Sequence, residues 1–68
     1  MIYTTTDNKG RRKQAATIEG ALCHAVLMIY CSDRDRAAAR ETLEQGKPAQ
    51  IVYGFNSITI TPEQEPRP

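Results

Sequence analysis

Apolar and polar residues have a helical spacing in the middle of the chain and a two-residue alternation near its end, while residues near its start have strand composition. Residues 2–6 (IYTTT) are rich in β-branched and aromatic side chains, which predicts a first strand. Residues 7–10 (DNKG) have turn chemistry, with Gly10 suited to a left-handed backbone. Residues 11–16 can return as a second strand or open a helix directly. We favour the strand, because a turn precedes it and Thr17 can cap the helix that follows.

The middle of the chain has the periodicity of an amphipathic helix. Its apolar stripe consists of Ile18, Leu22, Val26 or Ala25, and Ile29. Ser32, three residues before Asp35, resembles the start of a capping box, so either a second helix begins there or the first one continues through it. Gly46 and Pro48 then end the helical region.

The last part of the chain predicts a hairpin and a tail. Residues 49–53 and 57–61 flank the turn sequence GFN, with Ile58 and Ile60 on one face and Thr59 and Thr61 on the other. Residues 62–68 contain three prolines and no apolar anchor, which predicts a disordered, Pro-rich tail. Residues 1–61 are expected to form a single compact domain. Its expected class is α+β, a small antiparallel sheet of three or four strands with one or two helices packed on one face.

Size and charge restrict the function further. The chain has 68 residues and a formal net charge of +1, too little for a protein that coats nucleic acid. Residues 1–13 hold four cations and Asp7, which gives +3, and the rest holds five cations and seven acids, which gives −2. A core this small contributes about 3–5 kcal/mol, so a partner or a second copy would help to hold the fold.

Cysteine usage and the apolar run favour a cytoplasmic protein. Cys23 and Cys31 are expected on one helix, where their spacing of about 12 Å exceeds disulfide reach, so we expect two reduced, buried thiols. Residues 21–30 (ALCHAVLMIY) are too few to cross a bilayer. They also lie too far along the chain for a signal peptide. We expect neither export nor a membrane.

No set of residues predicts a reaction. His24 adjoins Cys23, but neighbours on a helix point about 100° apart and cannot form a catalytic dyad. Together with Cys31 they lack the ligand number and spacing of a zinc site. Phosphate-binding loops, paired acids in an apolar setting and nucleophile elbows are missing as well. We expect no enzymatic activity, no metal and no cofactor.

Two groups of residues are candidates for binding a partner. The first is a cluster of cations at the first turn, Lys9, Arg11, Arg12 and Lys13. We expect these cations to contact an acidic protein surface through charge complementarity and to contribute little to folding. The alternative is a cluster that is only solvated. The second group is Tyr53 and Phe55 at the last hairpin. An exposed Phe55 gains nothing from contact with water, which suggests an anchor for a partner. The alternative is a hairpin tip that folds back over the core.

The preferred hypothesis is therefore a protein-binding module, and the alternative is a small nucleic-acid-binding protein that uses residues 9–13. A homodimer is a further option. Residues 25–30 (AVLMIY) are apolar on every face of a helix, so either the rest of the domain buries them all or some reach a partner or twin subunit. The candidates for such exposure are Leu27, Met28 and Tyr30.

The C-terminal part of the chain also resembles a known group of proteins. An Ala-rich helix leads into GKPAQIVYGFNSITITPEQ, which is similar in size and layout to some very short phage-encoded anti-CRISPR proteins. The resemblance implies a non-enzymatic inhibitor, from a phage or another mobile element, that occupies a site on a CRISPR effector complex. It assigns no binding residue.

Overall fold

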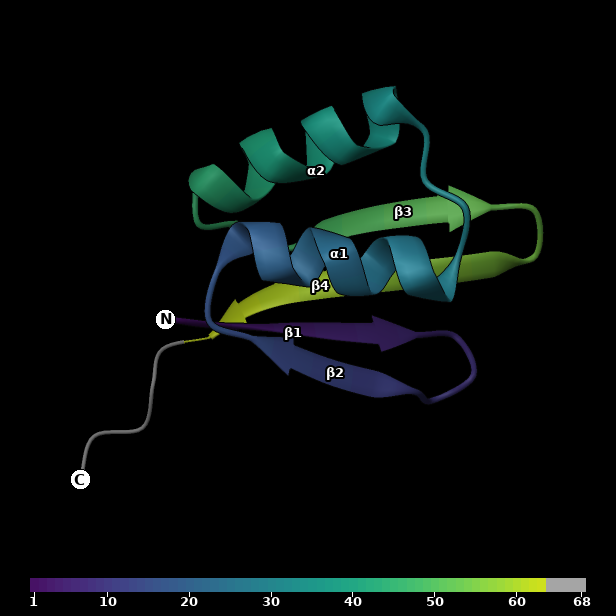
Figure 1. The fold of residues 1–68 in the computed structure, drawn as a ribbon, viewed down its shortest axis with the longest axis horizontal. Helices are drawn as coiled ribbons and strands as arrows, with labels where there is room; N and C mark the ends of the chain where they lie inside the picture. Colours follow the sequence, from purple (N-terminus) through teal and green to yellow (C-terminus); the bar gives the residue numbers. More distant parts are fainter. Residues whose placement is uncertain (64–68) are drawn as a thin grey trace.

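The computed structural model describes residues 1–63 as a four-stranded antiparallel sheet with two helices packed against one face (Figure 1). The elements are β1 (Ile2–Asp7), β2 (Arg12–Ala15), α1 (Ile18–Met28), α2 (Asp33–Glu44), β3 (Ala49–Tyr53) and β4 (Asn56–Glu63). The predicted α+β class is confirmed, with four strands and two helices. No helix within residues 1–63 has the length and apolar character needed to cross a membrane.

The first and last strands lie side by side in the middle of the sheet. The strand order is β2-β1-β4-β3, and β1 pairs with β4 from Ile2 opposite Glu63 to Asp7 opposite Ile58. Each hairpin therefore contributes one central strand and one edge strand. Alternation along β4 buries Ile58 and Ile60 under the helices, as predicted.

Capping residues set the helix boundaries as the sequence predicts. The Thr17 hydroxyl accepts a hydrogen bond from the Gly20 amide at 3.0 Å and caps α1. The Ser32 hydroxyl accepts one from the Asp35 amide at 3.1 Å, so a second helix begins here. Gly46, with a φ of 78°, follows the end of α2 in the left-handed conformation that glycine adopts without strain.

The link between the helices differs from the prediction. α1 ends at Met28, and Ile29 is already extended, with φ −144° and ψ 165°. Ile29 and Cys31 are buried while Tyr30 between them is exposed, which is the alternation of an extended segment. The apolar run 25–30 is therefore divided between a helix and an extended link, and Cys31 is not on the helix that holds Cys23.

The structure decides one alternative and corrects one expectation. Within the helical stripe, Ala25 is buried and Val26 is exposed, so Ala25 is the inward position. Cys23 is a free, exposed thiol rather than a buried one, whereas Cys31 is free and buried as expected.

β4 continues two residues beyond the expected domain boundary at residue 61, as far as Glu63. A proline is tolerated here because Tyr3 and Pro62 are a pair that exchanges no backbone hydrogen bonds. The position that Pro62 occupies therefore donates no hydrogen bond to β1, and its missing N–H costs nothing on that side. Toward β3, Pro62 lies beyond Ala49, where that strand begins. The remainder of the expected tail, 64–68, is outside the described residues.

The core is a single layer between the helices and the sheet. Small side chains from the helices, such as Ala21, Ala25 and Ala39, allow close packing on the isoleucines of the sheet. The buried apolar residues are Ala21, Leu22, Ala25, Ile29, Cys31, Ala39, Leu43, Ala49, Ile51, Ile58 and Ile60.

Candidate protein-binding site

The pairing of β1 with β4 brings the two hairpin turns to the same end of the molecule (Figure 1). β1 ends and β4 begins at this end, so the turn after β1 and the turn before β4 are neighbours. The cations of the first turn and the aromatic residues at the second turn are at least forty positions apart in the sequence. The fold makes them parts of one surface.

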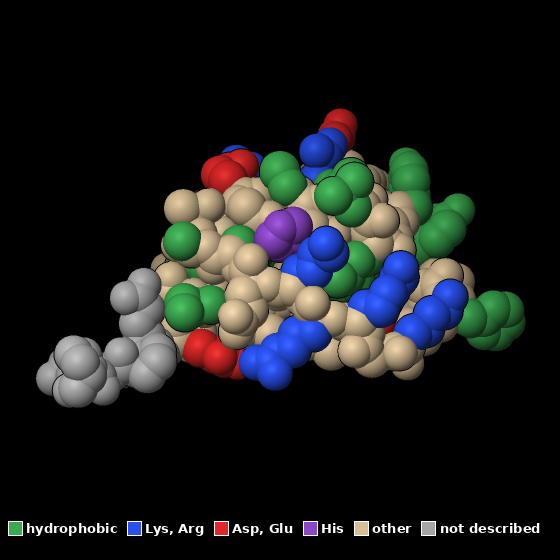
Figure 2. Space-filling view, turned by 60° about the horizontal axis from the view of Figure 1, so that its bottom comes forward, with side chains coloured by type: hydrophobic (Ala, Val, Ile, Leu, Met, Phe, Trp, Pro, Cys, Tyr) green, Lys and Arg blue, Asp and Glu red, His purple; other side chains and the backbone are tan. Residues whose placement is uncertain are grey.

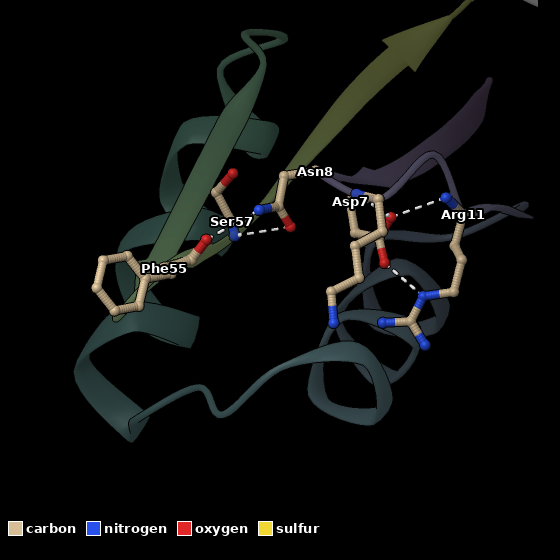
Figure 3. A network of polar contacts seen from close by, with 6 residues as sticks. Asp7, Asn8, Arg11, Phe55 and Ser57 are labelled. Carbon is tan, nitrogen blue, oxygen red and sulfur yellow. Dashed lines mark hydrogen bonds and ion pairs between the residues drawn. The ribbon is translucent and has the colours of Figure 1, made fainter.

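Asn8 ties the two turns together (Figure 3). Its side-chain Nδ2 donates a hydrogen bond to the Phe55 carbonyl at 2.8 Å, and its backbone amide donates one to the Ser57 carbonyl at 3.0 Å. The Ser57 amide in turn donates to Asn8 Oδ1 at 3.4 Å. These contacts fix the backbone on which Phe55 is carried.

The turn at Phe55 holds an apolar side chain fully in solvent. Gly54, with a φ of 62°, takes the first central position of a two-residue hairpin loop, and Phe55 takes the second. The Phe55 side chain is 100% exposed, so the tip does not fold back over the core. Nearby, the rings of Tyr30 and Tyr53 meet with centroids 5.1 Å apart at 52°, and both tyrosines are exposed.

Asp7 holds the shape of the first turn. Its side chain is 1% exposed and accepts hydrogen bonds from the Arg11 Nε at 2.5 Å, the Arg11 amide at 2.7 Å and the Lys9 amide at 3.0 Å. Burial by itself raises the pKa of this carboxyl, but these hydrogen bonds and the Arg11 charge together hold the pKa below its ordinary value. Arg11 is therefore committed to an internal ion pair, and Lys9, Arg12 and Lys13 are the freer cations of the cluster.

Those freer cations point in different directions. In β2, Lys13 is level with Thr5, which is buried under the helices, and Arg12 is level with Thr6 on the open face. Figure 2 shows lysine and arginine side chains in a row along this side of the molecule, leading toward hydrophobic side chains that project at one end. We call this surface the basic–aromatic end. It consists of Lys9, Arg12, Lys13, Tyr30, Tyr53 and Phe55.

Most residues of this surface are candidates from the sequence, but the contacts between them are not predictable from it. Asn8 was only a turn residue in the sequence, and nothing in its neighbours indicates a contact with Phe55. Tyr30 was a candidate for exposure, but its contact with Tyr53 depends on the extended link after α1.

The remaining reactive side chains do not assemble into a second site. Cys23 lines an open groove of about 500 Å³ between α1 and α2, with Leu22, Val26 and Leu27. His24, next to Cys23 on α1, is not among the residues that line this groove. Among residues 1–63, no three His, Cys, Asp or Glu side chains are grouped so that they could hold a metal ion.

Comparisons with known proteins identify no relative of this chain. No protein family, no curated protein and no solved structure matches the chain.

Proposed function

We propose that the chain is a non-enzymatic protein-binding module that uses its basic–aromatic end. Phe55 inserts into an apolar pocket of the partner, and the cations of the same end face an acidic surface. The observation that carries the proposal is the full exposure of Phe55 on a turn that Asn8 holds in place. Aromatic side chains in pockets supply much of the energy at protein interfaces.

The held turn makes this anchor effective. Ordering a loop on binding costs free energy, and a turn that is already fixed in the free protein avoids most of that cost. Tyr30 and Tyr53 extend the apolar contact beside Phe55. Lys9, Arg12 and Lys13 add charge complementarity, which mainly raises the rate of association with an acidic surface.

A pull-down from a bacterial lysate, with and without nuclease, tests this proposal. The parent and the Leu27→Ala variant should capture the same protein after nuclease treatment, and Phe55→Ala should lose it. Leu27 is a matched control because it is 78% exposed and lies in the groove between the helices. Capture that Phe55→Ala does not weaken would refute an anchor at this position.

A second candidate is binding to single-stranded nucleic acid, because such proteins stack bases on exposed aromatic side chains and bind the phosphates through nearby cations. The Tyr30–Tyr53 pair supports this reading. Titration of a fluorescent oligo-dT at several salt concentrations distinguishes the two. Three phosphate contacts would give a slope of about −2 in log affinity against log salt, and a protein-binding module should show no such binding.

The resemblance to anti-CRISPR proteins narrows the proposal to one partner, a CRISPR effector complex, and the narrower form rests on the resemblance alone. It predicts that the purified chain lowers target-DNA binding by such a complex and that Phe55→Ala restores it. An unchanged complex would remove this partner and leave the wider proposal standing.

A further inference from the structure

The outer edge of β3 has backbone groups without a partner strand. Ser57 lies opposite Val52, and its carbonyl accepts from the Asn8 amide on the other side of β4. Residues in an antiparallel pair point their N–H and C=O groups alternately toward and away from the neighbouring strand. Because Ser57 bonds toward β1, the backbone groups of Val52 face away from β4. Those of Gln50, two residues earlier, do the same.

The two edges of the sheet differ in charge. β2 begins with Arg12 and Lys13, and charged side chains on an edge strand oppose pairing with another chain. β3 (Ala49–Tyr53) has no charged residue. Val52 is also 60% exposed on the open face. Two β2 edges would repel each other, whereas two β3 edges would meet without like charges.

From these edges we infer that the chain forms a two-fold dimer in which β3 pairs antiparallel with β3 of a second copy, joining the two sheets into one. The dimer goes beyond the proposed function, because it uses the edge of β3; of the residues of the basic–aromatic end, only Tyr53 lies in that strand.

The neighbours of β3 select a single register. Centring the pair on Ile51 places Gln50 opposite Val52 of the second copy, and both outward-facing residues of each strand then gain partners. A shift toward the start of the strand would place Pro48, which has no N–H, opposite Val52. A shift the other way would place Gly54 opposite Gln50, but Gly54 has left-handed φ and has already left the strand.

The same register gives compatible side chains. Ala49, which is buried and small, is opposite Tyr53 of the second copy, so a small residue faces a large one.

The helical layer leaves room for the joined sheet. Four strands at about 4.8 Å span roughly 19 Å, and two helices packed about 10 Å apart need nearly the same width. The α2 flank that faces away from α1 contains Ala38 and Thr42, which lie about 160° around the helix from the groove residue Arg40. These small side chains, beside Asp35, leave room for α2 of each copy to approach the other.

Sedimentation and amide exchange on the full chain test the dimer. Between about 1 μM and about 1 mM, the mass should rise from the 7.6 kDa of one chain toward twice that value. The amides of Gln50 and Val52 should become protected from exchange over the same range. The Ile51 amide should be protected throughout, because it faces β4. A single-chain mass at every concentration, with fast exchange at residues 50 and 52, overturns the inference.

Variants at position 52 locate the interface. Val52→Pro removes only an outward-facing N–H, and Val52→Lys places a charge on the edge, so each should weaken the dimer about tenfold or more. Gln14→Lys adds the same charge to the opposite edge of the sheet and should leave the dimer unchanged. If Val52→Pro fails to fold, Val52→Lys decides. A dimer that survives Val52→Lys uses another surface and overturns the inference.

Discussion

Adjacent cations in the first turn contribute to the fold in different ways. The sequence predicts that the whole cluster contributes little, but Arg11 donates to the buried Asp7 carboxylate through both its side chain and its amide. Arg11→Ala leaves that carboxylate without its charged partner and should lower the melting temperature clearly. Arg12→Ala is the matched control and should change stability by no more than about 0.5 kcal/mol. Equal melting temperatures for the two variants would contradict an internal role for Arg11.

Asp7 also gives the fold a dependence on acid pH. Its folded pKa lies below the ordinary value of 3.8, so the carboxylate stabilises the fold fully above that value. This stabilisation is lost as the pH falls through the lower, folded pKa. Asp7→Asn should therefore melt earlier than the parent at neutral pH, and the difference should shrink in acid below 3.8. Thermal melts across this range measure it, and a difference independent of pH would argue against the ion pair.

The two cysteines should differ in reactivity. Cys23 is exposed, while burial and the nearby Asp35 charge raise the pKa of the Cys31 thiol above its ordinary value of 9.0. Because the thiolate is the reactive form, an alkylating reagent at neutral pH should modify Cys23 first. Mass spectrometry after partial labelling identifies the site. Two free thiols are expected after denaturation without reductant, and a disulfide or early labelling of Cys31 would contradict the structure.

At the scale of elements, the inner face of α1 is decisive for stability. Leu22 is 4% exposed and packs in the core, so Leu22→Ala should cost about 2–5 kcal/mol, most of the stability of a small domain. Leu27→Ala removes the same atoms from an exposed position of the same helix and should have little effect. Chemical denaturation of both variants gives the comparison. Similar midpoints would mean that the stripe does not face the core.

Local chemistry predicted most elements and their limits. Thr17, Ser32 and Gly46 act where capping rules place them, and the hairpin around Gly54 follows from turn chemistry. The link after Met28 could not be foreseen, because Ile29 and Cys31 are equally apolar in a helix and in an extended segment. The sequence does not predict the end of β4, because a proline usually ends a strand. Pro62 continues this strand because the N–H that it lacks would have no acceptor at that position.

At the scale of the molecule, Asn8 connects the two hairpins. Asn8→Ala removes the hydrogen bond to the Phe55 carbonyl and the acceptor of the Ser57 amide. Each of these exposed hydrogen bonds contributes no more than about 0.5–1.5 kcal/mol to the free energy of unfolding. The Ser57 amide should exchange faster, and partner capture should weaken although Phe55 is still present. Asn8→Asp keeps the acceptor for Ser57 and should preserve the slow exchange. Unchanged exchange in Asn8→Ala would show that other contacts hold the tip.

The sequence predicts the exposed residues of the candidate site, but it does not predict that they lie at the same end of the molecule. Turn chemistry placed Lys9 and Phe55 on exposed loops, which depends only on their neighbours. Their proximity depends on β1 pairing with β4 in one register, a contact between distant segments that local patterns do not specify. The ion pair of Asp7 with Arg11 likewise needs the buried position that this pairing creates.

Because β1 pairs with β4, the two central strands of the sheet come from opposite ends of the described chain. During synthesis β4 emerges after β2, both helices and β3, so β1 waits for its central neighbour until all the other elements have been made. Contacts between such distant segments close slowly, and the nascent hairpin and helices expose apolar surface in the meantime. The domain should therefore complete its fold only after β4 has emerged from the ribosome. A chain that stops before Asn56 should be removed by proteases, since it cannot bury Ile51 or complete the sheet.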